Sequence, residues 1–175
     1  NSLLGVTPKL LTEGIPDGAF KARLEGDEQT VCTELARRNR REREDRENRQ
    51  SRFDFGKSDS QVNLSDEFSR LSSTEDDSVS AVSQKEKIYN QLVGVHEYQN
   101  AKLLADLWCS VFTWKKDHSE AARLCPTDDD FLRFENNPKS ITAEVRAEVR
   151  EITKQYNFFH WHLAFPEVFQ LPEDG

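Results

Sequence analysis

YNFFHWHLAFPEVF, residues Tyr156–Phe169, is the stretch around which the rest of the chain is organised. Its large apolar side chains fall on every second position over residues 159–165, with histidine or alanine between them. A period of two is typical of a half-buried β-strand. Pro166 lacks an amide hydrogen and would end the strand pairing there. We therefore predict a short aromatic strand from about Phe158 to Phe165, within a C-terminal segment of residues 158–175.

The preceding segment, residues 84–157, carries apolar residues at helical spacing and is predicted to form a helical core. The pattern is clearest in Gln84–Lys116, where Gly94 is expected to kink or break the helix. Thr127 is a good N-cap for a short buried helix that follows it. The segment Ser140–Tyr156 is amphipathic, and its apolar face should lie against the longer helix.

Residues 1–26 are rich in glycine and proline and are predicted to form a loop-rich segment. Thr7 and Pro8 are good residues for an N-cap and a first helical position, so we expect a short helix over Lys9–Glu13. The segment also carries large apolar side chains that need a covering surface, and the N-terminal half of the chain offers little of one.

Residues 27–52 are predicted to form a charged helix. Its apolar stripe ends at Ala36, and residues 37–52 contain eight arginines and four acids. Two interpretations stay open: a solvated helix held by acid–base pairs such as Glu42 with Arg46, or a helix that contacts the phosphate backbone of DNA. The candidate DNA-binding residues under the second interpretation are Arg38, Arg41 and Arg43.

Composition restricts the remaining functions. Residues 53–83 are rich in Ser and Asp, which is typical of a flexible linker. The net charge of the whole chain is −8, which argues against a general affinity for nucleic acid. No apolar run reaches the roughly 20 residues that a membrane helix needs, so no membrane partner is expected. Three scattered cysteines predict neither a zinc site nor a disulfide framework and are typical of a cytoplasmic protein.

The sequence contains no motif for catalysis. A glycine-rich phosphate loop, a Ser-His-Asp order and an HExxH motif are all absent, so no catalytic residue is assigned. His160 and His162 would share one face of the predicted strand. Two imidazoles alone are a thin set of metal ligands, so a structural pair is favoured over a metal site. From its residues alone, the chain is a mostly helical, acidic, non-catalytic module.

Two stretches of the chain resemble a known family. FHWHLAFPEVF, residues Phe159–Phe169, is similar to the FHW-x-LEFPEVF signature of large bacterial N6-adenine DNA methyltransferases of the restriction-modification and phage-defence type, which usually have Glu at the position of Ala164. The N-terminal NSLLGVTPKLLTEGIPDGAF resembles that family's Gly-Asn-Ser-Leu-Ile/Leu-Gly, Thr-Pro and Gly-Ile-Pro-Asp-x-Ala-Phe elements. LWCSVFTWKK and CPTDDDFLRF fit the family's middle region more loosely.

The resemblance implies an internal segment between two motifs that the chain lacks, the glycine-rich cofactor motif and the catalytic Asn-Pro-Pro-aromatic motif. The absence of methionine and the first residue, Asn1, also lead us to expect an excised piece of a longer protein. The parent enzyme would transfer a methyl group from S-adenosylmethionine to the exocyclic amine of an adenine taken out of the DNA stack. Asn1 would lie at the end of a cofactor-side strand and is the one candidate cofactor-binding residue.

The expected fold class is therefore mainly α, a helical insertion module with a short aromatic β-strand near the C-terminus. The expected partners are DNA through the parent enzyme, the remainder of the methyltransferase domain and subunits of a defence system. The isolated chain is not expected to be an enzyme. A second hypothesis, a stand-alone helical protein-interaction module, also stays open. The gene sequence after Gly175 separates the two, because only the first hypothesis requires an Asn-Pro-Pro-aromatic motif there.

Overall fold

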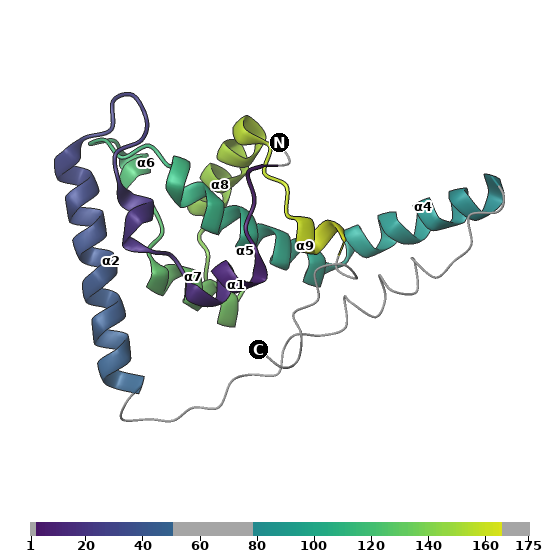
Figure 1. Cartoon of the computed structure of the whole chain (residues 1–175), viewed down its shortest axis with the longest axis horizontal. Helices are drawn as coiled ribbons and strands as arrows, with labels where there is room; N and C mark the ends of the chain where they lie inside the picture. Colours follow the sequence, from purple (N-terminus) through teal and green to yellow (C-terminus); the bar gives the residue numbers. More distant parts are fainter. Residues whose placement is uncertain (1–2, 51–78, 166–175) are drawn as a thin grey trace.

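The computed structural model describes residues 3–50 and 79–165, and every regular element within these ranges is a helix (Figure 1). The long helix α5 (His96–Thr113) lies at the centre of the body. Helix α2 (Gln29–Gln50) lies along one side of the body, and α8 (Ala143–Tyr156) packs on α5. The mainly helical fold class is thus confirmed.

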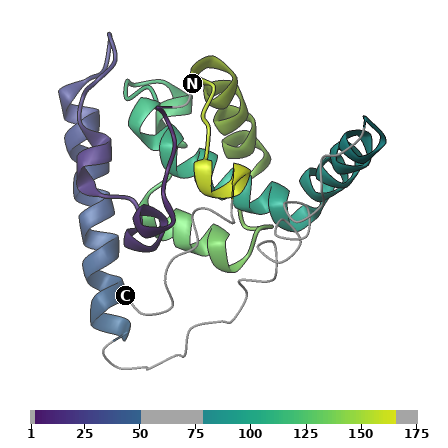
Figure 2. The ribbon, with the colours of Figure 1, turned by 45° about the vertical axis from the view of Figure 1, so that its right-hand side comes forward.

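Helix α5 is the core helix because its C-terminal half is buried nearly all round. All residues from 105 to 111 are buried, and each large apolar side chain among them contributes about 1.5–3 kcal/mol to stability. Helix α4 (Val79–Gly94) precedes α5 and extends away from the body in both views (Figures 1 and 2). Because α4 ends at Gly94 and α5 begins at His96, the predicted break at this glycine is confirmed.

Two of the helices after α5, α7 and α8, pack against it as their sequence patterns predict. Helix α6 (Glu120–Arg123) is a single turn that connects α5 to α7 (Asp128–Asn136). Helix α7 begins at the predicted N-cap, Thr127, and packs on α5. Helix α8 buries Val149 and Ile152 in the same core. The apolar face of α8 therefore lies where the amphipathic pattern places it.

The N-terminal segment contains two short helical elements, α1 (Pro8–Glu13) and the 3-10 turn η1 (Asp17–Phe20). Helix α1 confirms the short helix predicted there. Ile15 and Phe20 are fully buried, and η1 packs on α2 and α5, so these two apolar side chains find their covering surface within the chain. Leu3 does not, and it is 89% exposed.

Side chains from α2 and α7 hold the turn between α1 and η1. Asp128 is 1% exposed, and its carboxylate accepts hydrogen bonds from the Ile15 amide at 2.7 Å and from Arg46 at 2.5 Å. The buried Asn39 accepts a hydrogen bond from the Asp128 amide at 2.8 Å and donates one to the Ile15 carbonyl at 3.2 Å. A buried carboxylate is tolerated only when it is paired and hydrogen-bonded in this way. We call Ile15, Asn39, Arg46 and Asp128 the Asp128 clamp.

Gly14 allows the turn to approach the clamp. Its φ is +76°, which L side chains rarely adopt, and an added Cβ would lie 2.0 Å from the carboxylate of Asp128. Its carbonyl accepts a hydrogen bond from Trp108 Nε1 of α5 at 2.8 Å. Only glycine satisfies both the backbone conformation and the close contact.

The predicted aromatic β-strand is wrong. His160 is extended, but Trp161–Ala164 forms the helical turn α9, in which the amides of residues 163 and 164 bond to the carbonyl of His160. The described residues contain no strand with which this stretch could form a ladder. Backbone polar groups need partners, and here a local helical turn supplies them in place of a sheet.

We expect Gly14→Ala to lower the free energy of unfolding by about 2–4 kcal/mol, because the new Cβ strains the backbone and collides with the buried carboxylate. Gly18→Ala is the matched control, since nothing lies within 4 Å of a Cβ added there. The control should change stability by no more than about 0.5 kcal/mol. Urea unfolding followed by circular dichroism measures both, and equal effects of the two substitutions would contradict the assignment.

Candidate functional site

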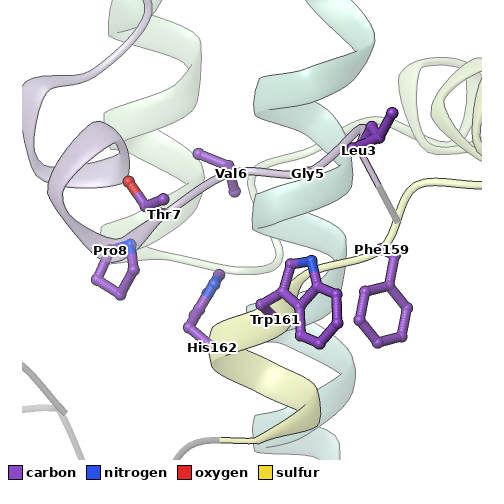
Figure 3. A pocket seen from close by; sticks show the side chains of 8 residues that line it. All are labelled: Leu3, Gly5, Val6, Thr7, Pro8, Phe159, Trp161 and His162. Carbon is purple, nitrogen blue, oxygen red and sulfur yellow. The ribbon is translucent and has the colours of Figure 1, made fainter. Parts of the chain in front are cut away.

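The two stretches that resemble the methyltransferase family lie side by side in the structure. Leu3–Val6 runs next to the segment that leads into α9 (Figures 1 and 3). The Phe159 amide donates a hydrogen bond to the Leu4 carbonyl at 2.8 Å. A Cβ added to Gly5 would lie 2.0 Å from the Phe159 carbonyl oxygen, so glycine is required for this close approach. We call residues 3–6 and 158–165 together the junction.

A buried histidine holds the junction on α5. His160 is 4% exposed, and its Nδ1 accepts a hydrogen bond from the Val6 amide at 3.3 Å. A ring nitrogen that accepts carries no proton, so this hydrogen-bond network assigns the ring proton to Nε2. Nε2 then donates to Asp106 of α5 at 2.9 Å. Lys102 Nζ lies 2.6 Å from the other oxygen of the Asp106 carboxylate, so the buried acid has partners on both sides.

The outer face of the junction is apolar. Trp161 and Phe165 are large aromatic side chains that remain exposed there, and we call them the aromatic patch. The Trp161 ring meets Phe159 edge to face at 5.0 Å and stacks on Phe165 at 5.7 Å between ring centroids. A small pocket of about 130 Å³ opens between the two segments, with Pro8 among its lining residues (Figure 3). Exposed aromatic side chains in contact with one another make this face a candidate interaction surface.

His162 lines this pocket, with its ring centroid 6.1 Å from that of His160. Burial lowers the pKa of His162 below its ordinary value, the neighbouring His160 lowers it further, and a hydrogen bond with the Val6 backbone opposes both effects. The two imidazoles do not share the strand face that the sequence pattern predicted for them. His160 is buried on α5, whereas His162 lies at the pocket. In the part of the chain that the structure describes, no three side chains group as metal ligands.

The three arginines predicted to contact DNA lie in different surroundings. Arg38 forms ion pairs with two acids at 2.7 and 3.3 Å. Arg43 donates to the Ile15 carbonyl at 2.7 Å and lies 3.5 Å from Asp17. Arg41 is exposed. Two of the three candidates therefore contribute to the fold directly, and the contact of α2 with DNA stays a prediction.

The charged helix packs through its polar groups. Glu42 and Arg46, named as an example of an intrahelical pair, both bond to other partners: Glu42 accepts from Thr127 Oγ1 at 2.6 Å, and Arg46 pairs with Asp128. Both contacts join α2 to the start of α7. A helix with almost no apolar stripe can pack in this way because its partner surface supplies buried acids and hydroxyls.

Several residues named from the sequence carry no site geometry. Asn1, the candidate cofactor-binding residue, lies outside the described residues. Of the predicted linker, residues 53–78 also lie outside them, and residues 79–83 form the start of α4. The three cysteines are free and buried, and burial raises the pKa of Cys109 and of Cys125 to about 12. No helix of the described ranges has the length and apolar character to span a membrane.

Three buried charged residues escaped the sequence analysis. Asp106 lies within the apolar run of α5, and an acid in such a run is a usable signal of a buried partner. Lys116 is buried at the end of α5, where Nζ donates to two carbonyls at 2.9 Å; a lysine just after a helix end is the signal for this contact. Asp128 looks from the sequence like an ordinary acid at a helix start, and only the tertiary packing shows its burial.

Comparisons of the chain with protein-family models, with curated proteins and with solved structures found no match.

We expect Arg43→Gln to lower the free energy of unfolding by about 1–3 kcal/mol, because it leaves partly buried acceptors without their charged donor. Arg41→Gln is the matched control on the same helix and should have an effect within about 0.5 kcal/mol. Urea titration of the two variants and the parent sequence gives both values. A larger loss for Arg41→Gln than for Arg43→Gln would be incompatible with the contacts described above.

The Asp17 carboxylate should make stability depend on pH. Its burial acts to raise the pKa, but hydrogen bonds from Asn39 and Arg40 outweigh it, and the pKa lies below the ordinary 3.8. A carboxyl with a lowered folded-state pKa contributes stability above pH 3.8, and this contribution is lost as the pH falls below that value. We expect Asp17→Asn to cost about 1 kcal/mol at pH 7 and less at pH 3. Unfolding curves at both pH values test this, and an unchanged difference would refute it.

Proposed function

We propose that this chain is an internal helical segment of a DNA adenine-N6 methyltransferase of the restriction-modification or phage-defence type. The parent protein, acting in the cytoplasm with other subunits of a defence system, transfers a methyl group from S-adenosylmethionine to adenine in DNA. The segment itself is non-catalytic. The proposal starts from the family resemblance of residues 1–20 and 159–169.

The observation that carries the proposal is the contact between these two stretches. Val6 and His160 are 154 positions apart and are joined by a hydrogen bond. An insertion has to leave and re-enter its host domain at neighbouring points, which is why domains whose ends lie close together are readily inserted. The junction meets this requirement, and α2, α5, α7 and α8 lie between its two sides along the chain.

The residues shared with the family's N-terminal elements also have structural roles here. Gly14 has no room for a Cβ, and the Ile15 amide belongs to the Asp128 clamp. Asp17 forms ion pairs with Arg40 at 3.0 Å and with Arg43 at 3.5 Å. Under the proposal, the family's members use these residues for the same local contacts.

The aromatic patch supplies a surface for the host domain. Trp161 is 44% exposed and Phe165 is 42% exposed, and both lie at the junction where the chain would meet its host. Aromatic side chains of this type are enriched in protein interfaces. We therefore propose the remainder of the methyltransferase domain as the partner that covers the patch.

Any contact of α2 with DNA would be weak and non-specific. Arg38 and Arg43 are engaged within the fold, which leaves the exposed Arg37 and Arg41 as the better-placed cations. Each neutralised phosphate steepens the salt dependence of binding by only about 0.9 in log–log slope. We propose that α2 adds such contacts only within the parent enzyme, where other surfaces hold the DNA.

The gene and the parent protein test the proposal. A glycine-rich cofactor motif should precede Asn1, and an Asn-Pro-Pro-aromatic motif should follow Gly175. The protein that carries both should transfer labelled methyl groups to adenine in DNA, and replacing the asparagine of the second motif with alanine should abolish the transfer. Calorimetric titration of the isolated chain should show no binding of S-adenosylmethionine. Micromolar binding by the isolated chain, or a gene without the two motifs, would contradict the proposal.

The aromatic patch also fits a second candidate, a stand-alone helical module that binds another protein. The two candidates differ in the gene sequence, because a stand-alone module requires neither flanking motif. Absence of both motifs would therefore favour the second candidate.

A further inference from the structure

One imidazole ring joins three parts of the fold. His160 Nδ1 accepts from the Val6 amide of the N-terminal segment, and Nε2 donates to Asp106 of the core helix α5. A neutral imidazole can accept on one nitrogen and donate from the other, whereas an imidazolium donates from both and accepts from neither. Nε2 already carries its proton toward Asp106, so a second proton can enter only at Nδ1. That position faces the Val6 amide, which is itself a donor.

We propose that His160 is a proton-sensitive clasp, in which proton uptake at Nδ1 and release of the Val6 amide are one event. The covalent structure does not change: the ring gains one proton from solvent and keeps its hydrogen bond to Asp106. The amide loses its acceptor, and Leu3–Val6 loses a hydrogen bond that holds it to the segment before α9. The clasp thus makes the shape of the junction depend on pH, whichever partner the junction binds.

The charged and titratable groups around the His160 ring favour or oppose its protonated form. Asp106 favours the imidazolium, and its charge is offset by Lys102 on the same helix. Tyr98 and Cys109 of α5 lie within electrostatic range of Asp106. Burial raises the pKa of Cys109 and the Asp106 charge raises it further, while the pKa of Tyr98 is raised first by burial, then by Tyr89 and then by Asp106, so both groups stay neutral. From α9, His162 opposes a second positive charge nearby. The remaining neighbour, the segment of residues 3–6, has no titratable side chain.

The release would alter the pocket. Gly5 and Val6 form part of its wall, and His162 and Trp161 form the opposite part (Figure 3). Detaching the Val6 amide removes one of the hydrogen bonds that fix the first wall, while the hydrogen bond between His162 and the Val6 backbone still joins the two walls. Acidification is therefore expected to loosen the junction and to leave the core around α5 intact.

Nuclear magnetic resonance of the whole chain tests the clasp. At pH 7.5 the ring nitrogen shifts of His160 should show the neutral form with the proton on Nε2. As the pH is lowered to about 5, the proposal requires the ring to become an imidazolium. The protection of the Val6 amide, corrected for intrinsic exchange, should fall about tenfold in step with it, as expected for loss of one hydrogen bond. The Val111 amide in the core should keep its protection.

Variants separate the clasp from general acid effects. In His160→Asn the side-chain oxygen can replace Nδ1 as the acceptor but takes up no proton, so Val6 protection should become independent of pH. His118→Asn changes an exposed histidine and should leave the response of the parent sequence unchanged. His162→Gln should retain the loss of Val6 protection, since the response belongs to His160.

Four results would overturn the proposal. Two concern the ring itself: a His160 ring that stays neutral down to pH 5, or a neutral ring with its proton on Nδ1. The other two are a Val6 amide that stays protected while His160 is an imidazolium, and an unchanged pH response of Val6 protection in His160→Asn. If His160→Asn does not fold, the parent sequence decides alone, through the agreement or disagreement between the His160 titration and the Val6 exchange.

Discussion

The buried carboxylate of Asp128 is the constraint on which the rest of the structure depends. A carboxyl group at 1% exposure is tolerated only if hydrogen-bond donors surround it. Here the donors come from the backbone of the N-terminal turn and from Arg46 of α2. Burying this group therefore requires α2, the turn and α7 to be in place together. It also explains how a helix as charged as α2 joins a compact body.

The junction at the other end of the core follows the same rule. Asp106 is buried on α5, and His160 satisfies it while also accepting the Val6 amide. The N-terminal segment is thus attached at two points, and in each a backbone amide is bound by a buried side-chain network. These polar contacts explain why the two stretches that resemble the methyltransferase family meet on one face. The arrangement is what the proposed insertion into a host domain requires.

Local sequence patterns predicted the helices of the core well. The apolar spacing of α5 and α8, the N-cap Thr127 and the break at Gly94 depend only on residues close in sequence, and such features are readable in this way. The aromatic stretch was mispredicted as a strand because alternation has meaning only if a neighbouring strand exists. Its true partner, Leu3–Val6, accepts a backbone hydrogen bond from Phe159 at Leu4 and is not part of a sheet.

The candidate site was less predictable than the fold. The arginines of α2 were visible in the sequence, but their partners were not, since Asp17 and Asp128 are far from them along the chain. Intrahelical spacing pairs Glu42 with Arg46, whereas both residues bond across elements in the structure. Asp106 is the exception, because an acid inside an apolar helical run indicates a buried partner without any knowledge of the fold.

The central claim is that the two family-like stretches form one junction. The most direct measurement is the nuclear Overhauser effect between the α protons of Gly5 and His160, because a Cβ built on Gly5 lies 3.6 Å from the His160 Cα. The account predicts a strong cross-peak, together with one between the Phe159 amide and the Leu4 α proton. If neither cross-peak appears in the folded chain at neutral pH, the two stretches do not meet and the account is wrong.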